Sequence, residues 1–220
     1  DRLAADGAVR LRIAVADLPA RRRQLESALE EALHPDAVGA GWAALERAYA
    51  FAGGEPLAAQ PLVDVALRLL QVGVHSRRVA QAGFGALLRG GGWSADIDEA
   101  DARARIEAAL RERLPPEASL ERLQRTVARL AGGLRAPRLT ADLEASLDAL
   151  RAAPRRQVPS LWGGTFARLL DALGWPGQRS LLPAEAAACD ELRAVLGGLQ
   201  ALDAVLGRVD AGEALRQLQR

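Results

Sequence analysis

The stretch Ser119–Leu134, with the sequence SLERLQRTVARLAGGL, determines the fold class of this chain. Its apolar residues recur at spacings of three and four, which places their side chains on one face of an α-helix. They are Leu120, Leu123, Val127, Leu130 and Leu134. Ser119 is a suitable N-cap, and Gly132-Gly133 followed by Pro137 are typical of a helix end. The stretch therefore predicts an amphipathic helix.

Segments on both sides of this helix show the same periodicity, so we expect helices along most of the chain. Before Ser119 we expect three helices. The first is lined by Val63, Ala66, Leu67 and Leu70, and the second runs from Ser76 to Leu88 and is ended by Gly90–Gly92. The third is capped by Asp96 or Asp98, carries Ile106, Leu110 and Leu114, and is stopped by Pro115-Pro116. After Leu134 we expect one helix from Thr140 and one from Ser160. A long helix from Pro183 follows, with Leu192, Val195, Leu199, Leu202 and Leu206 as its apolar stripe. A final helix begins with Asp210 and Glu213 as a capping box.

The composition favours the same fold class and excludes several kinds of chemistry. The 220 residues hold no Lys, Met or Asn, so all 29 basic residues are arginines, set against 28 acids. Ile and Thr are scarce, which disfavours an extended sheet. Without Lys, a P-loop, Schiff-base chemistry and the usual Asp/Glu-x-Lys nuclease core are excluded. The absence of Met, with Asp1 first, indicates a piece of a longer chain.

The first 55 residues differ from the rest, and we predict a domain boundary there. Arg10–Ala16 alternates apolar and polar residues, which is typical of a strand, and Arg47–Phe51 is a weaker strand that could pair with it. Asp17 and Pro19 signal a helix between them, with Leu25, Leu29 and Leu33 on one face. We therefore expect a strand–helix segment over residues 1–55 and a multi-helix domain over 56–220, a mainly α fold.

No constellation of catalytic or metal-binding residues is visible in the sequence. His34 and His75 stand apart from each other, whereas a metal site needs several converging ligands. Asp96–Asp101 is acidic but lacks the pattern of an EF-hand and suits a helix start. Cys189, the single cysteine, fits a small core residue in a reducing compartment. We therefore predict no catalytic residue, metal or cofactor, no membrane span or secretion signal, and a cytoplasmic location.

Three clusters of arginines are the candidate binding residues. They are Arg21, Arg22 and Arg23, then Arg77 and Arg78, then Arg155 and Arg156. The planar guanidinium group suits phosphate oxygens, so these clusters are candidates for contacts with DNA phosphates. The near equality of acids and arginines leaves open that each cluster is simply a solvated helix face. We rank Arg21–Arg23 first, because it lies in the first turns of a helix, where backbone N–H groups also favour anions.

The C-terminal third carries an ordered string of motifs that supports a resemblance to a known family. The string is Ser160-Leu-Trp162, Phe166–Leu173, Gly174-Trp-Pro-Gly177, Arg179-Ser-Leu181, Leu202–Leu206 and Glu213-Ala-Leu215. Upstream, Arg12–Val15 with Asp17–Arg22, and Gly54–Leu57 with Pro61-Leu-Val63 and Ala66-Leu67, belong to the same resemblance. The chain resembles a bacterial family of DNA repair proteins similar to the AddB-type subunit of helicase–nuclease complexes, which have a degenerate helicase region and a RecB-like nuclease domain.

The resemblance implies what this part of such a protein does. Residues 1–55 would belong to a RecA-like lobe, residues 56–220 would form its helical insertion, and the exonuclease domain of the parent would lie beyond Arg220. Gly174, Trp175, Pro176 and Gly177 would form a structural corner and not a site. The implied function is a non-catalytic scaffold that contacts DNA phosphates and the rest of the parent chain or a partner subunit. The alternative is a helical protein–protein interaction module that does not bind DNA.

Overall fold

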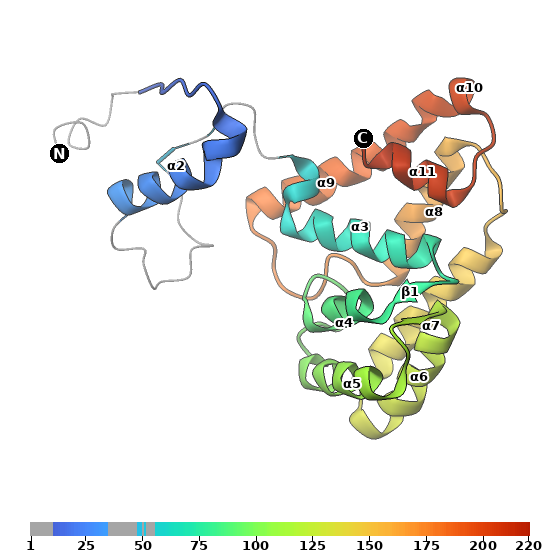
Figure 1. Ribbon diagram of the computed structural model, residues 1–220. Helices are drawn as coiled ribbons and strands as arrows, with labels where there is room; N and C mark the ends of the chain where they lie inside the picture. Colours follow the sequence, from blue (N-terminus) through green and yellow to red (C-terminus); the bar gives the residue numbers. More distant parts are fainter. Residues whose placement is uncertain (1–10, 35–47, 50, 52–55) are drawn as a thin grey trace. The chain divides into compact units, whose positions relative to one another are not determined.

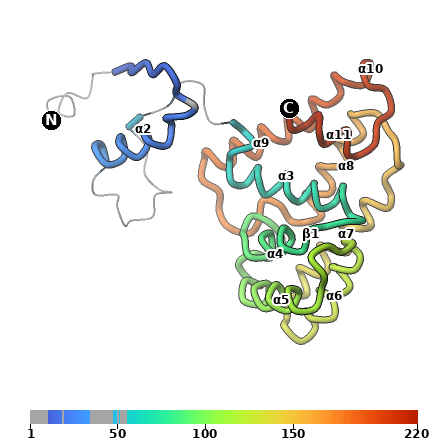
Figure 2. Tube along the Cα trace, viewed as in Figure 1, coloured from blue at the N-terminus to red at the C-terminus, as the bar shows by residue number. Residues whose placement is uncertain are grey.

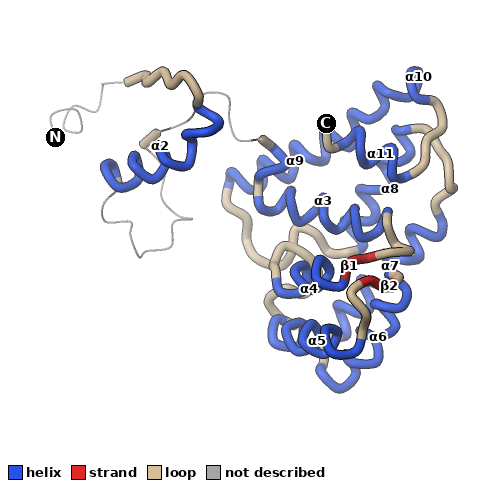
Figure 3. Tube along the Cα trace, viewed as in Figure 1, coloured by secondary structure: helices blue, strands red, loops and turns tan. Residues whose placement is uncertain are grey.

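The computed structural model describes residues 11–34, 48–49, 51 and 56–220 (Figure 1). The chain divides into two compact units, Asp1–Gly54 and Glu55–Arg220. The described residues are mainly α-helical, as predicted, and Figure 3 shows that the two paired strands among them are very short.

The first unit contains one described helix, α2 (Leu18–Leu33), which begins just after Asp17 as predicted. The aromatic residues Tyr49 and Phe51 contact this helix. The Tyr49 hydroxyl donates to Glu30 Oε1 at 3.1 Å, and the Arg22 guanidinium lies 4.8 Å from the Phe51 ring centre. These contacts hold Tyr49 and Phe51 against α2.

The predicted N-terminal strand is wrong over its described part. Residues 11–15 have no regular structure, and Leu11 and Ile13 are 71% and 63% exposed. Its predicted partner, Arg47–Phe51, shows no strand at the described positions 48, 49 and 51, while 47 and 50 lie outside the described residues. Alternating apolar residues form a strand only where a neighbour completes the hydrogen-bond ladder, and the described residues of this unit provide none.

The second unit begins with a 3-10 turn, η3 (Leu57–Ala59), and the apolar helix α3 (Pro61–Val74). The expected residues Val63, Ala66, Leu67 and Leu70 are all buried. Pro61 opens the helix at a position where its missing N–H costs nothing. Helix α3 contacts α4, α7, α8, α9 and α11, whose bounds follow, so it is the central element of the unit.

The remaining helices pack mainly on their neighbours in sequence, as the tube in Figure 2 shows. They are α4 (Gln81–Arg89), α5 (Ala100–Arg113), α6 (Leu120–Leu134), α7 (Pro137–Ala152), α8 (Pro159–Ala172), α9 (Pro183–Gly198), η4 (Leu199–Leu202), α10 (Asp203–Leu206) and α11 (Ala211–Leu218). No helix in the described residues combines the length and apolar character needed to span a membrane. One continuous apolar core links these helices.

The only paired strands among the described residues are β1 (Val79–Ala80) and β2 (Glu117–Ala118), which run antiparallel. The predicted helix start at Ser76 is wrong, because residues 79 and 80 pair with β2 and α4 begins only at Gln81. Ser76 instead uses its carbonyl to accept the N–H of Leu120 at 2.7 Å. The small sheet therefore ties the entrance of α4 to the entrance of α6.

The helix boundaries around the sheet differ in how well the sequence predicted them. Ser119 caps α6 as predicted, accepting the N–H of Arg122, and Asp210 caps α11 by accepting the N–H of Glu213. Gly132 and Gly133 do not end α6, which continues to Leu134. Arg135 then adopts a left-handed conformation (φ 59°) and closes the helix.

Other predicted starts and ends were shifted. Neither Asp96 nor Asp98 caps α5, which begins at Ala100, and helices α7 and α8 begin at Pro137 and Pro159 rather than at Thr140 and Ser160. Proline at the first helical position is compatible with helix geometry, so both helices begin before the polar residues expected to start them. The long helix predicted from Pro183 ends at Gly198 and changes to η4 and α10, so its stripe is not continuous.

Candidate functional site

The first-ranked arginine cluster lies on the N-terminal half of α2. Arg21 and Arg23 are exposed, whereas Arg22 is half-buried and holds its guanidinium over Phe51. Only Arg21 and Arg23 of this cluster therefore present their charge fully to solvent.

The other two clusters also divide their arginines between free and engaged side chains. Arg77 and Arg155 are exposed and have no carboxylate within 4 Å among the described residues. Arg78 forms an ion pair with Glu117 across the small sheet, and Arg156 donates to the carbonyl of Arg208 at 2.8 Å. The two clusters belong to different connecting segments, one between α3 and α4 and one between α7 and α8.

The GWPG motif, Gly174–Gly177, forms a buried corner after α8. Trp175 is 4% exposed, and its indole Nε1 donates to the Leu62 carbonyl at 2.8 Å, which connects the corner to α3. The peptide bond before Pro176 is cis. Gly174 (φ 68°) and Gly177 (φ 96°) adopt left-handed conformations that favour glycine, and a Cβ on Gly177 would lie 2.7 Å from an Asp96 carboxylate oxygen.

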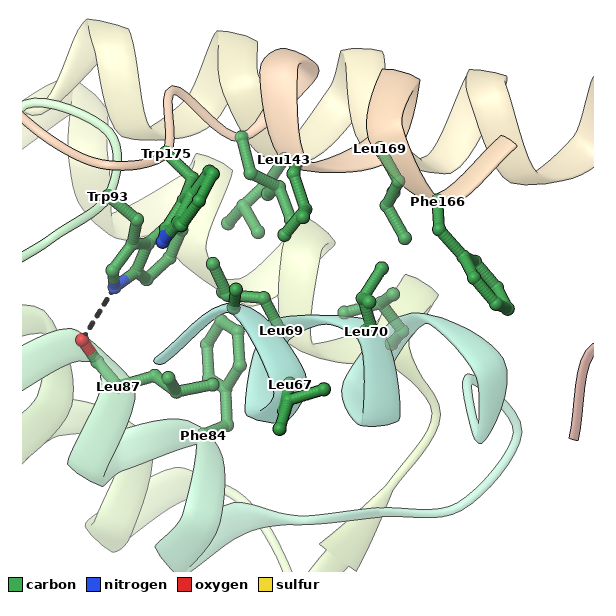
Figure 4. Packing of buried hydrophobic residues seen from close by; sticks show 14 of the residues in the cluster. Leu67, Leu69, Leu70, Phe84, Leu87, Trp93, Leu143, Phe166, Leu169 and Trp175 are labelled. Carbon is green, nitrogen blue, oxygen red and sulfur yellow. Dashed lines mark hydrogen bonds between the residues drawn. The ribbon is translucent and has the colours of Figure 1, made fainter. Parts of the chain in front are cut away.

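A second tryptophan loop packs against this corner. Asp96 accepts the backbone N–H groups of Gly92 at 2.7 Å and Gln178 at 2.9 Å, and the Ser94 N–H donates to the Leu173 carbonyl at 2.8 Å. Trp93 is fully buried and donates its indole N–H to the Leu87 carbonyl (Figure 4). Asp96, which the sequence suggested as a helix cap, thus joins two loops more than 80 residues apart.

Arg103 is the most deeply buried charged residue in the corner, and the sequence did not single it out. It is 1% exposed and donates to the carbonyls of Leu87, Leu88, Gly90 and Trp93 at distances between 2.9 and 3.2 Å. Its guanidinium lies 4.4 Å from the Trp93 ring centre. Burial lowers the pKa of Arg103 to about 10, although the carboxylates of Asp96, Glu99 and Asp142 oppose this shift.

Glu99 connects the same region to α7. Its two carboxylate oxygens accept the backbone N–H groups of Arg138 at 2.7 Å and Leu139 at 2.9 Å, in the first turn of α7. A carboxylate in this place satisfies N–H groups that have no partner within the helix. Every strong polar contact of Arg103 and Glu99 is thus made to backbone groups, which is the pattern of a structural network and not of a reactive centre.

An open groove of about 680 Å³ lies between α3 and α4. Apolar side chains line much of it, including Leu67, Phe84 and Leu87. Of its lining residues, Arg68 is paired with Asp64 at 2.8 Å, and Arg78 is paired with Glu117. His75 also lines the groove, but the described residues contain no group of three or more His, Cys, Asp or Glu side chains placed to bind a metal.

The outward face of α6 carries further exposed arginines, Arg122, Arg125 and Arg129, that the sequence analysis overlooked. Adjacent arginines stand out in a sequence. These three are separated in the sequence and become neighbours only because the helix brings positions three and four apart to one side.

Comparison with the profiles of known protein families, with curated proteins and with solved structures finds no match. The resemblance to helicase–nuclease subunits therefore rests on the sequence motifs alone.

Proposed function

We propose that this chain is a non-catalytic helical part of a DNA repair and recombination protein of the helicase–nuclease kind, where it acts as a scaffold and binds DNA through its phosphates. The observation that carries the DNA-binding proposal is the set of exposed arginines without an acidic partner in the described residues, Arg77, Arg122, Arg129 and Arg155 among them. The formal net charge is only +1, so binding would depend on where these arginines lie and not on an overall basic excess.

Contacts between arginines and phosphates should make the DNA-binding affinity depend on salt concentration in a specific way. Arginines that neutralise about three or four phosphates release condensed counterions, so the slope of log K against log salt should be about −3 on duplex DNA. Phosphate contacts do not distinguish bases, so affinity should be equal for duplexes of different sequence. Fluorescence anisotropy with two labelled duplexes of equal length, titrated at 50, 100 and 200 mM salt, measures both properties. Absence of binding at 50 mM salt would overturn the proposal.

A second candidate is a helical protein–protein interaction module, and the groove between α3 and α4 favours it. The same titration separates the two functions, because this module would not bind DNA even at low salt. The proposed parentage has its own test in the complete reading frame of the gene. A nuclease domain encoded downstream of Arg220 would support it, whereas a frame that ends there would contradict it.

A further inference from the structure

Helix α6 has two faces of opposite character. Leu120, Leu123, Val127 and Ala131 are buried in the core. On the outward side, Arg122, Arg125 and Arg129 are exposed at spacings of three and four, and therefore lie in one row. At a rise of 1.5 Å per residue the row extends over about 10.5 Å of helix axis. Figure 1 shows α6 at the edge of the second unit, beside α5 and α7.

The arginine row combines lack of neutralisation with regular spacing. Several helical arginines elsewhere in the unit meet an acid three or four positions away, as in the pairs Arg68–Asp64, Arg138–Asp142 and Arg193–Asp190. Arg105, Arg113 and Arg168 have no such ion pair among the described residues, but they do not follow one another at spacings of three and four. No carboxylate of the described residues lies within 4 Å of any of the three guanidinium groups on α6. This row therefore presents uncompensated positive charge to a partner.

Glu121, the one acid in the sequence of α6, is already engaged by another helix. The carboxylate of Glu121 binds Arg151 of α7 at 2.9 Å. Arg125 acts on Glu121 only as a more distant charge, and its Nε donates instead to the Glu121 backbone carbonyl at 3.3 Å.

Two glycines follow the arginine row on the same face of α6, towards the end of the helix. Gly132 and Gly133 are exposed, and a Cβ added at either position would meet no atom within 4 Å. Glycine inside a helix costs about 1 kcal/mol relative to alanine, and no packing within the described chain requires it here. The glycines leave the helix backbone bare next to Arg129, which permits close approach by an extended partner.

The aromatic residues indicate which form of nucleic acid this face suits. Proteins that bind single strands stack bases on exposed aromatic side chains. In the second unit the aromatic residues Trp93, Trp162, Trp175, Phe84 and Phe166 are all buried. Figure 4 shows Trp93, Trp175, Phe84 and Phe166 within the core. Contacts made by arginines alone, without a stacking surface, match the sugar–phosphate backbone of a duplex.

We propose that the outward face of α6, formed by Arg122, Arg125, Arg129, Gly132 and Gly133, is the surface on which this chain binds the backbone of duplex DNA. The inference rests on the proposed function and assigns it to a surface that lies outside the arginine clusters selected from the sequence.

The test compares two triple variants with the same change in charge. The first is Arg122→Gln with Arg125→Gln and Arg129→Gln. The second changes Arg105, Arg168 and Arg208 to Gln, exposed arginines outside every proposed binding surface, and serves as the matched control. We expect the α6 variant to lower duplex affinity at least tenfold at 50 mM salt and to make the salt slope shallower by about 2 to 3, because each lost phosphate contact removes about one. The control should change affinity less than threefold. Circular dichroism and thermal melting confirm that both variants fold.

A double variant, Gly132→Ala with Gly133→Ala, tests the close approach separately. It should raise the melting temperature, because alanine is the better helix former, and yet weaken duplex binding at least threefold. Raised stability with unchanged binding would contradict a role for the glycines at the interface.

The outcomes distinguish this inference from the proposed function. If wild type binds duplex DNA and the α6 variant binds equally well, the assignment to α6 is wrong and the function stands. If the control variant loses as much affinity as the α6 variant, the loss reflects overall charge and the assignment to α6 is wrong. If wild type binds single strands more tightly than duplex, the choice of partner is wrong. If wild type binds no DNA at 50 mM salt, both proposals fall.

Discussion

Replacing Arg103 with Met should destabilise the second unit more than any change to an exposed arginine. Methionine keeps an unbranched apolar side chain in the space of the arginine stem but removes every N–H donor. The carbonyls of Leu88, Gly90 and Trp93 would then lose the donor that the guanidinium provides, while the Leu87 carbonyl would keep its bond from the Trp93 indole.

The expected loss is about 3 kcal/mol. The two buried carbonyls of Leu88 and Trp93 and the part-buried carbonyl of Gly90 cost about 1 kcal/mol each without a donor, and the lost stacking of Arg103 on Trp93 adds about 1 kcal/mol. Part of this is returned, because the folded protein no longer has to bury a guanidinium whose pKa burial lowers to about 10. For a unit of this size, such a loss lowers the melting temperature by roughly 6–12 °C.

The control is Arg105→Met, which makes the same change two residues further along α5 at an exposed position. It should alter the free energy of unfolding by less than about 0.5 kcal/mol. Urea denaturation followed by tryptophan fluorescence and by circular dichroism measures both variants. If Arg103→Met costs less than about 1 kcal/mol, the guanidinium network is not what holds the two tryptophan loops together.

Two further changes test other contacts. Asp203→Ala should lower the free energy of unfolding by about 1–2 kcal/mol in urea titrations, because Asp203 accepts the N–H and the hydroxyl of Ser160 at 2.8 and 2.6 Å. The control is Asp190→Ala, at an exposed position of α9. Burial raises the pKa of the Cys189 thiol, so it should react with a thiol reagent at pH 8 only on unfolding. Because the unfolded thiol ionises first, this group's contribution to stability should fall as the pH rises above about 8.5, and rapid labelling of the native protein would contradict the buried position.

The helical core was predictable because its signal is local. The residues expected to line the apolar faces in Ser119–Leu134 and around Val63–Leu70 are buried or partly buried in the structure. Helix periodicity requires no knowledge of what lies opposite, since any partner buries the same face. The N-terminal strand failed for the opposite reason: a strand depends on a neighbour, and alternation of Leu11, Ile13 and Val15 carries no information about one.

Helix starts were less predictable where long-range contacts decide them. Ser76 is a good N-cap by residue type, but the pairing of Val79 with Ala118 holds the chain extended there and delays α4 to Gln81. Asp96 suited a helix start equally well, yet its carboxylate binds the backbone of Gln178. In both cases the competing partner is distant in the sequence, so local propensity could not reveal it.

The candidate site shows the same division between local and distant information. Runs such as Arg77-Arg78 and Arg155-Arg156 are conspicuous in a sequence, but both pairs lie in segments that connect helices. One member of each pair is engaged, Arg78 by Glu117 and Arg156 by the Arg208 carbonyl. Arg122, Arg125 and Arg129 were inside the very helix that determined the fold class. The spacing that predicted its buried leucines places these arginines on the opposite side of the helix, so the core face and the proposed DNA-binding face of α6 follow from one periodicity.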